Sequence, residues 1–357
     1  MIKRVDIHSY KLLYNLSLES FGCFNIFTGR NNAGKTSVLE AIYLNTWDES
    51  PMDNLIKIFD KFRDFRLNKD SAELLFYKRN LESNIGVTAQ FDNKDIYKIA
   101  LEIGVGKSDS VDEDSIQLDF SFNFERNDSE DTKKTKLIIE ENKSVHNYGR
   151  IVEVSRRIAP KEAKMLMPYY NALYSTFIPA NVLSIDVLDY FIEKVLKPKK
   201  KKEFLKWLKV FDEQIADVFQ MDKDVCVQLK NEANEEGYPI QSYGIGFIKY
   251  FVICCSLVQN SANYIFIDEI ENGLHYKSVE RLLDMILKLS QEYGIQVFAT
   301  THNAEFLHKM LKSAEKQKIE DIMLFNLYKY KGQVKASSYD YFSIKQELEE
   351  YGSELRF

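Results

Sequence analysis

A glycine-bearing loop between a short apolar run and a helix-forming segment constrains this chain more than any other stretch. The apolar run Phe24–Thr28 has the length and composition of a buried strand, and GRNNAGKT follows it from Gly29 to Thr36. These residues match G-x-x-x-x-G-K-[ST] at every fixed position. Because strand, loop and helix occur in the order that phosphate binding needs, the stretch predicts a phosphate-binding loop rather than an accidental match.

The chemistry of the loop explains its spacing. Gly29 and Gly34 permit backbone conformations that a Cβ would block, so successive N–H groups can turn toward phosphate oxygens. The predicted helix at 35–45 points its positive N-terminal end at the same anion. Lys35 is expected to reach the β- and γ-phosphates, and the Thr36 hydroxyl to hold Mg²⁺. The predicted triphosphate contacts are Arg30, Asn31, Asn32, Ala33, Gly34, Lys35, Thr36 and Ser37.

A second apolar run, Tyr264–Ile267, ends in two acids. Open α/β sheets bind ligands at the carboxyl ends of their strands. Asp268 is therefore predicted to hold Mg²⁺, through water, and Glu269 to orient and deprotonate the attacking water. Taken alone, the run would be an ordinary strand end with solvated acids. The phosphate-binding loop upstream favours the functional interpretation.

Two further motifs flank the acidic strand. The turn QSYGIG at 241–246 opens an apolar helix, and another buried strand at 295–299 ends in TTHN, which places His302 at its carboxyl end. Ser242 and the N–H groups at the helix start form an anion-binding terminus. The alternative for residues 241–246 is a plain turn that leads into the helix. The alternative for His302 is a histidine that packs in the core or caps a helix.

In this order, the motifs resemble those of the ABC-type ATPases, and within them the RecF, SMC and OLD (overcoming lysogenization defect) group. The resemblance covers residues 1–45 and 238–310. It implies that Ser242 and Gly244 form a signature that closes over the γ-phosphate of ATP bound to a partner subunit. Lys35 already occupies one side of the triphosphate, so ATP would join two heads.

The resemblance assigns two more elements and leaves one position open. Residues 271–275 (ENGLH) resemble the loop that joins the two sites, and His302 matches the switch histidine that senses the γ-phosphate. The family's Mg²⁺-sensing glutamine has no clear counterpart: Gln90 lies in a strand-like stretch, whereas TFIP at 176–179 resembles the corresponding loop in OLD-like proteins and lacks glutamine. Asn303 stands where serine is common.

The predicted fold class is α/β, a P-loop NTPase of the ABC ATPase head type with an inserted antiparallel β-subdomain and a compact helical arm. Alternation predicts strands at 2–8, 86–91, 96–105, 116–126 and 136–141, and helical spacing dominates 159–233. The predicted parts are an N-terminal part of the head (1–155), a helical insertion (156–236) and a C-terminal part of the head (237–357).

Charge and cysteine content limit which classes of protein the chain can belong to. The formal net charge of -6 argues against a uniformly basic nucleic-acid binder. The lysine-rich run KPKKKK at 197–202, with Lys206 and Lys209, could contact a phosphate backbone or form an exposed turn that interrupts the helical pattern. No apolar run approaches the about 20 residues of a membrane span, and no signal peptide or C-x-x-C pair occurs. A cytoplasmic protein without a membrane partner is expected.

Three functions from different classes fit these features. The first is an OLD-like ATPase that forms a homodimer or higher oligomer on ATP and regulates a separate nuclease or toxin in bacterial antiviral defence. About 55 residues follow His302, which leaves no room for the nuclease domain of OLD enzymes. The second is a RecF-like repair clamp that binds DNA, and the third is the energising subunit of a transporter, for which the segment between loop and signature is long.

Overall fold

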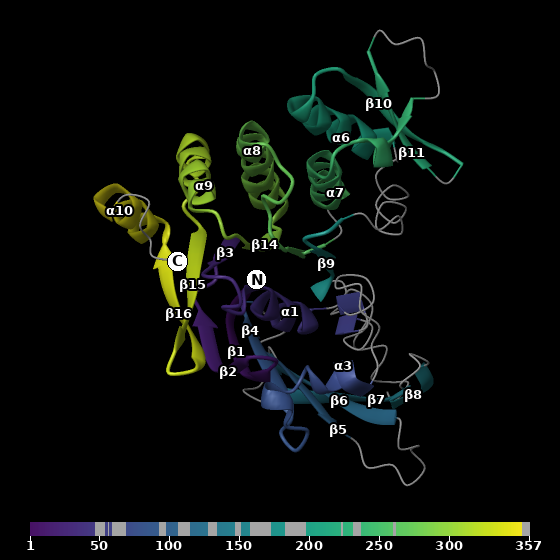
Figure 1. Ribbon diagram of the computed structural model, residues 1–357, viewed down its shortest axis with the longest axis vertical. Helices are drawn as coiled ribbons and strands as arrows, with labels where there is room; N and C mark the ends of the chain where they lie inside the picture. Colours follow the sequence, from purple (N-terminus) through teal and green to yellow (C-terminus); the bar gives the residue numbers. More distant parts are fainter. Residues whose placement is uncertain are drawn as a thin grey trace.

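The computed structural model describes most of the 357-residue chain. The described residues are 1–46, 54, 55, 57, 58, 69–92, 98–105, 115–127, 134–146, 151–157, 173–182, 198–222, 224–230, 237–259 and 262–351. Three layers are visible in Figure 1: helices, a mostly parallel sheet, and an antiparallel sheet on the opposite side. The N-terminus lies beside the central sheet.

The central sheet has six strands in the order β16-β15-β3-β14-β13-β9. Neighbours from β15 to β9 pair in parallel, and β16 is antiparallel to β15. Its strands are β3 (Phe24–Thr28), β9 (Ser175–Ile178), β13 (Tyr264–Ile267), β14 (Gln296–Thr300), β15 (Ile322–Tyr330) and β16 (Gln333–Asp340). Strands β3, β9, β13 and β14 are buried along their whole length, which explains why their sequences are mostly apolar runs.

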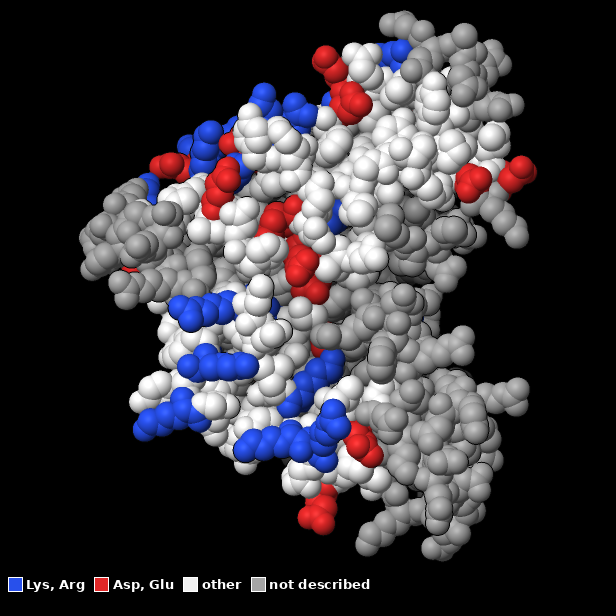
Figure 2. Space-filling model, viewed as in Figure 1, with Lys and Arg blue, Asp and Glu red and all other residues white. Residues whose placement is uncertain are grey.

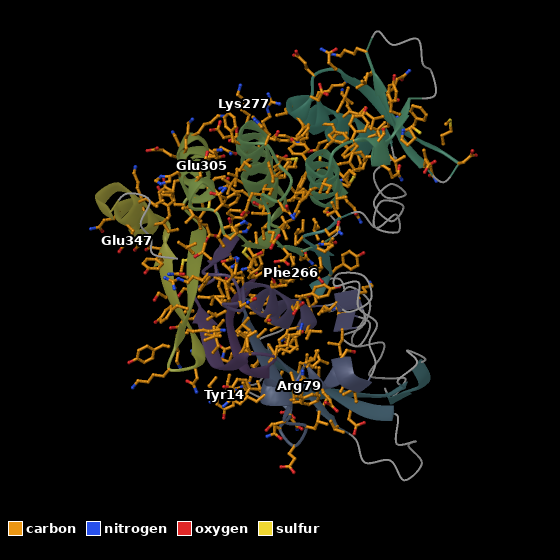
Figure 3. All side chains as sticks on the ribbon, viewed as in Figure 1. Tyr14, Arg79, Phe266, Lys277, Glu305 and Glu347 are labelled. Atoms are coloured by element: carbon orange, nitrogen blue, oxygen red, sulfur yellow. The ribbon has the colours of Figure 1, made fainter. Side chains whose placement is uncertain are left out.

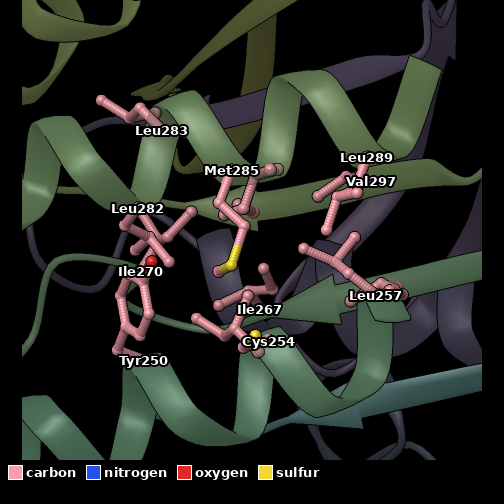
Figure 4. Packing of buried hydrophobic residues seen from close by; sticks show 14 of the residues in the cluster. Tyr250, Cys254, Leu257, Ile267, Ile270, Leu282, Leu283, Met285, Leu289 and Val297 are labelled. Carbon is pink, nitrogen blue, oxygen red and sulfur yellow. The ribbon is translucent and has the colours of Figure 1, made fainter. Parts of the chain in front are cut away.

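Helices cover one face of this sheet, and α1 (Lys35–Leu44) lies on the other (Figure 1). The covering helices are α7 (Ile245–Gln259), α8 (Tyr276–Tyr293) and α9 (Ala304–Gln317). Side chains alternate along β13: Ile265 and Ile267 join the helix-side core, and Phe266 joins the core on the α1 side. Figure 4 shows Met285 of α8 and Cys254 of α7 meeting over Ile267. The sheet therefore separates two hydrophobic cores.

The core on the α1 side is built largely from aromatic rings. The Phe266 ring stacks on Phe298 with centroids 5.2 Å apart, and it lies at the centre of the molecule in Figure 3. Phe27 and Phe325 are a further stacked pair, with centroids 5.4 Å apart. Such rings bury large areas and set the spacing between the central sheet and the second sheet.

The second sheet has seven antiparallel strands in the order β2-β1-β4-β5-β6-β7-β8. They are β1 (Ile2–Tyr10), β2 (Leu13–Glu19), β4 (Ile85–Phe91), β5 (Lys98–Val105), β6 (Ser115–Asn127), β7 (Lys134–His146) and β8 (Ile151–Arg157). The predicted β-subdomain is present, but it extends the N-terminal strand pair through β1 and β4 and is not a sheet of its own. The short α3 (Lys69–Glu73) and η2 (Tyr77–Arg79) precede β4.

The helical prediction for 159–233 is wrong at three strands, β9, β10 (Ile215–Met221) and β11 (Asp224–Leu229). Together with β12 (Tyr238–Pro239), β10 and β11 form a three-stranded antiparallel sheet. A register shift between Ile215 and Asp217 makes Ile215 and Val218 the buried residues of β10. Because a β-bulge inserts one extra residue, this strand shows the three-residue apolar spacing of a helix.

Residues 198–202 of the lysine-rich run form the start of a helix, and Lys197 and the residues just before it lie outside the described residues. Helix α6 (Pro198–Phe211) starts at Pro198, a position that proline favours because its missing N–H would be unpaired there anyway. Lys201 forms an ion pair with Asp217 at 2.8 Å, and the Lys206 ammonium lies 6.0 Å from the Trp207 ring centroid. These lysines have partners within the chain, which favours the exposed-surface interpretation.

The C-terminal part has a helix, two strands and a further helix. Helix α9 leads into β15 and β16, and α10 (Tyr341–Tyr351) closes the described chain. Residues 352–357 lie outside the described residues. All four cysteines are buried and form no disulfide.

Gln296, at the start of β14, joins the two sheets. Its side chain is fully buried, and its Nε2 donates to the carbonyls of Ile2 and Gly22 at 2.8 Å each. Its Oε1 accepts the Ile2 N–H at 2.8 Å. Four main-chain and side-chain polar groups thus satisfy one another in a dry environment, where an unpaired group would be costly.

We expect Gln296→Leu to lower the free energy of unfolding by roughly 2–4 kcal/mol, because Ile2 and Gly22 would keep buried polar groups without partners. Equilibrium unfolding in urea, followed by tryptophan fluorescence and circular dichroism, measures the change. Gln333→Leu on the half-exposed β16 is the control, with an expected change below about 0.5 kcal/mol. Equal destabilisation by both substitutions would contradict the assignment of Gln296.

Candidate nucleotide-binding site

The predicted site residues gather where four parallel strands end. The phosphate-binding loop follows β3, Thr300 and His302 mark the end of β14, and Asp268 and Glu269 follow β13. Residues 179–182 follow β9, the next strand along. Carboxyl ends of parallel strands form the ligand-binding edge of α/β folds. Gln90 instead lies in β4 of the second sheet, opposite Arg4 and Lys98.

The loop after β3 has the conformation that its glycines predict. Gly29 has φ +133° and Gly34 has φ +101°, and a Cβ on Gly29 would lie 2.2 Å from the Leu327 carbonyl oxygen. Asn32 adopts φ +61°, a left-handed conformation that asparagine tolerates better than most residues. Arg30, Asn31 and Asn32 are exposed; Ala33, Gly34 and Ser37 are buried; Lys35 and Thr36 are half-buried.

Lys35 folds back over the loop. Its Nζ donates to the carbonyls of Gly29 at 2.7 Å and Arg30 at 3.2 Å. Burial lowers the pKa of the Lys35 ammonium, and the carboxylates of Asp268 and Glu269 act in the opposite direction. An ammonium in this position can exchange its carbonyl partners for phosphate oxygens, which are stronger acceptors.

Asp268 contacts hydroxyl groups from two different parts of the site. Thr36 Oγ1 lies 3.0 and 3.2 Å from its two carboxylate oxygens, and Thr300 Oγ1 donates to Oδ1 at 2.6 Å. Thr300 Oγ1 in turn accepts the Glu269 N–H at 2.7 Å. Burial raises the pKa of the Asp268 carboxyl, while the bonds from Thr300 and Thr36 lower it. One hydrogen-bonded chain therefore joins the phosphate-binding loop to the ends of β13 and β14.

The pair formed by Thr36 and Asp268 suits Mg²⁺. Mg²⁺ sites in nucleotide enzymes use one or two protein oxygens and complete their octahedron with water and phosphate. Among the described residues, no group of three or more His, Cys, Asp or Glu could hold a metal, so a dedicated all-protein cage is absent there. A hydroxyl beside a buried carboxylate, facing a phosphate-binding loop, fits the first kind of site.

Glu269 adopts an unusual backbone conformation. Its φ of +46° lies in the left-handed region, which costs a residue with a Cβ roughly 1–2 kcal/mol. Its carboxylate Oε2 lies 3.4 Å from Asn272 Nδ2, and Asn272 also lies 3.4 Å from the carbonyl of Ala180. Backbone strain of this kind is common at functional sites. The half-buried carboxylate thus faces the loop after β9.

Lys249 is a residue of this site that the sequence motifs do not predict. It lies one turn into the apolar helix α7, is fully buried, and donates from Nζ to the carbonyls of Asp268 at 2.8 Å and Glu269 at 2.6 Å. Burial lowers the pKa of its ammonium to about 8. A single charged residue in the run of 247–259 was the available signal, since lysine is almost never fully buried without a partner.

His302 lies beside the site with its side chain about half exposed. Its main-chain N–H donates to Glu271 Oε1 at 3.2 Å, and its Nδ1 lies 3.5 Å from the same oxygen. Asn303 caps α9 by accepting the Glu305 N–H at 2.9 Å. The capping role expected as an alternative for His302 thus belongs to Asn303, which leaves the imidazole accessible.

Ser242 and Gly244 do not meet Lys35 within the subunit. Ser242, in η3 (Ile240–Ser242), is exposed, and its Oγ donates to the Pro239 carbonyl at 2.6 Å. Gly244 is exposed, with open space where a Cβ would stand. Both residues precede α7 and lie on the surface. The structure therefore brings together every predicted site residue of the loop and the two strands, and leaves the signature apart.

A cavity of about 400 Å³ adjoins the phosphate-binding loop, between residues 30–33 and residues 326–329 of β15. A larger one of about 760 Å³ shares Lys329 with the first, and Leu12, Phe76, Tyr77 and Arg79 are among its lining residues. Apolar side chains and rings beside cations suit a ligand with both a planar ring and negative charge.

Comparison with known proteins places this geometry in a family. A family model described as "AAA domain, putative AbiEii toxin, Type IV TA system" matches residues 24–308, which is more than half of the chain. The chain is also similar to an "ATP/GTP phosphatase" of Helicobacter pylori, with 28% identity over 329 residues that cover 86% of each chain. A shorter similarity, 33% over 104 residues, covers 29% of this chain and 47% of "Uncharacterized protein MJECL10" of Methanocaldococcus jannaschii.

Solved structures share the fold at low identity. An SMC head bound to the C-winged helix domain of ScpA covers 95% of this chain and 97% of its own, with a TM-score of 0.51 and 13% identity. An SMC head with an extended coiled coil, bound to the C-terminal domain of ScpA derived from Pyrococcus furiosus, covers 98% and 99%, with a TM-score of 0.50 and 12% identity. The predicted P-loop α/β fold of the ABC ATPase head type is confirmed. The chain belongs to the family described by that AAA domain, and it is a P-loop ATPase with an SMC-like head.

Proposed function

We propose that this ATPase binds ATP with Mg²⁺ at the carboxyl edge of its central sheet, dimerises on the nucleotide and regulates a separate effector in bacterial defence against phage. The observation that carries the proposal is the chain of hydrogen bonds from Thr36 through Asp268 and Thr300 to Glu269. It links the phosphate-binding loop to the acidic strand, as hydrolysis of a bound triphosphate requires.

Each group at this edge has a distinct part in hydrolysis. Lys35 and the N–H groups of residues 30–37 would bind the β- and γ-phosphates, and Thr36 and Asp268 would hold Mg²⁺, which would neutralise charge on the phosphates. Glu269, whose carboxylate lies 3.4 Å from Asn272 Nδ2, would accept a proton from the attacking water. His302, whose Nδ1 lies 3.5 Å from Glu271 Oε1, would contact the γ-phosphate from the end of β14.

The larger cavity is the proposed place for the base and sugar. Leu12 connects it to the phosphate site, because its Cδ1 lies 3.3 Å from the position of a Cβ on Gly34. The Tyr77 ring, which stacks on Tyr14 at 4.8 Å between centroids, offers a planar partner. A base there would keep its phosphates within reach of Lys35.

The exposed signature supplies the other half of the site. Ser242 and Gly244 are exposed at the entrance to α7, where they are accessible to the nucleotide of a second copy. Resemblance to the RecF, SMC and OLD group supports a homodimer, or a higher oligomer, with ATP between the heads.

A defence role rests on the OLD-like resemblance and on the type IV toxin–antitoxin system named in the family description. The predicted effector is a separate nuclease or toxin. Among the described residues, no helix is long and apolar enough to cross a membrane. We place the protein in the cytoplasm.

A RecF-like clamp on duplex DNA is the second candidate, favoured by one surface feature. Figure 2 shows Lys and Arg side chains gathered on the lower part of the visible face. Exposed cations of this region are Lys78 and Arg79 of η2 and Lys329 and Lys331 at the β15–β16 turn. Tight, ATP-dependent binding of duplex DNA by the isolated protein, weakened by salt, would favour the clamp.

Lys35→Ala is expected to abolish ATP binding, because the loop loses the one ammonium that replaces its carbonyl contacts with phosphate. Isothermal titration calorimetry with ATP and Mg²⁺ measures the affinity. Lys312→Ala, on the exposed face of α9, serves as the matched control and should bind as the unaltered protein does. Unchanged ATP affinity in Lys35→Ala would contradict the phosphate assignment.

Glu269→Gln is expected to slow hydrolysis by about 10²–10⁴-fold and to leave ATP bound, because the amide cannot accept the proton of the water. An ATP-bound dimer should then accumulate and be detected by light scattering. Glu305→Gln, an exposed acid at the start of α9, is the control. Finding only monomer with ATP in Glu269→Gln would count against the base role or against shared sites.

Ser242→Arg is expected to block dimerisation on ATP without weakening ATP binding to the monomer, because the long side chain occupies the surface that meets the partner's nucleotide. Sedimentation velocity with the non-hydrolysable analogue AMP-PNP reports assembly, and calorimetry reports binding. Normal dimerisation of this variant would remove the signature role. Loss of binding to the monomer would show that Ser242 belongs to the same subunit's site.

A further inference from the structure

Lys249 connects the helix that follows the signature to the catalytic edge of the same subunit. It lies one turn into α7, and its fully buried Nζ donates to two consecutive carbonyls, those of Asp268 and Glu269. Moving an ammonium out of water is costly unless strong acceptors replace the water. Lys249 is therefore held at these two carbonyls by the apolar surroundings of its own helix.

Several bonds fix the backbone of Glu269 in its left-handed conformation. Its N–H donates to Thr300 Oγ1 at 2.7 Å, and its carbonyl accepts both Lys249 Nζ at 2.6 Å and the Asn272 N–H at 2.9 Å. A residue in the left-handed region relaxes unless its surroundings determine its conformation. Lys249 is the contributor that comes from outside the strand ends and the loop 270–275.

A second close contact joins α7 to the same loop. Gly246, in the first turn of α7, lies so close to Gly273 that a Cβ on Gly246 would stand 2.1 Å from the Gly273 carbonyl oxygen. Gly273 has φ +76°, and a Cβ there would stand 3.0 Å from Gly246 N. Two glycines thus allow main-chain contact, and Lys249 lies one turn further along the helix. The start of α7 and the loop after Glu269 cannot move independently.

We propose that Lys249 is a positioning residue that sets the direction of the Glu269 carboxylate and makes it depend on the placement of α7. The proposal deepens and rests on the proposed function, in which Ser242 and Gly244 at the entrance to α7 meet the nucleotide of a partner. When Ser242 and Gly244 contact the γ-phosphate bound to the partner, α7 passes the effect to Glu269 of the subunit that supplies Ser242 and Gly244. Each subunit thus responds, through its own α7, to ATP bound at the site of its partner.

The test separates nucleotide binding from hydrolysis. Lys249→Met keeps an unbranched side chain, one atom shorter, in an apolar environment and removes the ammonium. Lys35 and Thr36 are untouched, so the Kd for ATP should stay within about threefold, while the single-turnover rate should fall at least about tenfold. A defect in folding alone would change the Kd and the melting temperature together.

A double variant tests whether Lys249 affects the rate of hydrolysis through Glu269. If Lys249 acts through Glu269, adding Lys249→Met to Glu269→Gln should lower the rate by no more than about twofold beyond Glu269→Gln alone. A full additional loss would overturn the proposal, as would an unchanged rate in Lys249→Met. Ser256→Ala is the matched control, since it removes another buried side-chain bond of α7 that stays within the helix. Its rate and Kd should match the unaltered protein.

Failure of the inference and failure of the proposed function give different results. A slow Glu269→Gln together with a fast Lys249→Met rejects only the role of Lys249. A fast Glu269→Gln rejects the base itself. If Lys249→Met does not fold, Lys249→Gln, whose uncharged side chain is one atom shorter than that of lysine, replaces it, and a rate at least about tenfold lower at an unchanged Kd is again expected.

Discussion

The parallel pairing of β9, β13, β14 and β3 determines the placement of the reactive groups. Two main-chain hydrogen bonds continue this pairing beyond the strands, from Asp268 N to the Ile178 carbonyl at 2.9 Å and from Thr301 N to the Phe27 carbonyl at 3.0 Å. The first functional residue after β13 is thus still part of the hydrogen-bonded sheet. Its position is set by main-chain bonds inside a fully buried sheet, which deform less than loops do.

Two ammonium groups, those of Lys35 and Lys249, lie close to the carboxylates at this edge of the sheet. Each donates to main-chain carbonyls. Burial lowers the pKa of both lysines and the nearby carboxylates raise it. The two lysines differ in access, however: Lys35 is half-buried and can turn to a ligand, whereas Lys249 is enclosed by its helix. Only the first is suited to exchange partners, and the second is suited to hold a fixed geometry.

Local sequence predicted those parts of the site whose chemistry depends on neighbours along the chain. The phosphate-binding loop, the acids after β13 and the order of these motifs along the chain follow from short sequence patterns. Each of these patterns has a single structural interpretation. Lys249 and Thr300 act on residues about 20 and 32 positions away, so no local pattern marks their partners. Strand β10 was missed for a different reason, because a bulge gave it the apolar spacing of a helix.

The position of α7 explains why the proposed ATP-contacting residues lie on two separate surfaces of the subunit. In the proposed dimer the entrance to α7 meets a second copy, and Ser242 and Gly244 at this entrance are exposed. The helix itself is apolar and is buried from Gly246 to Val258. A rigid, buried helix with an exposed entrance transmits a contact at that entrance to whatever its buried part touches. Because that part touches the carbonyls of Asp268 and Glu269, the proposed assembly and the proposed hydrolysis would depend on the same helix.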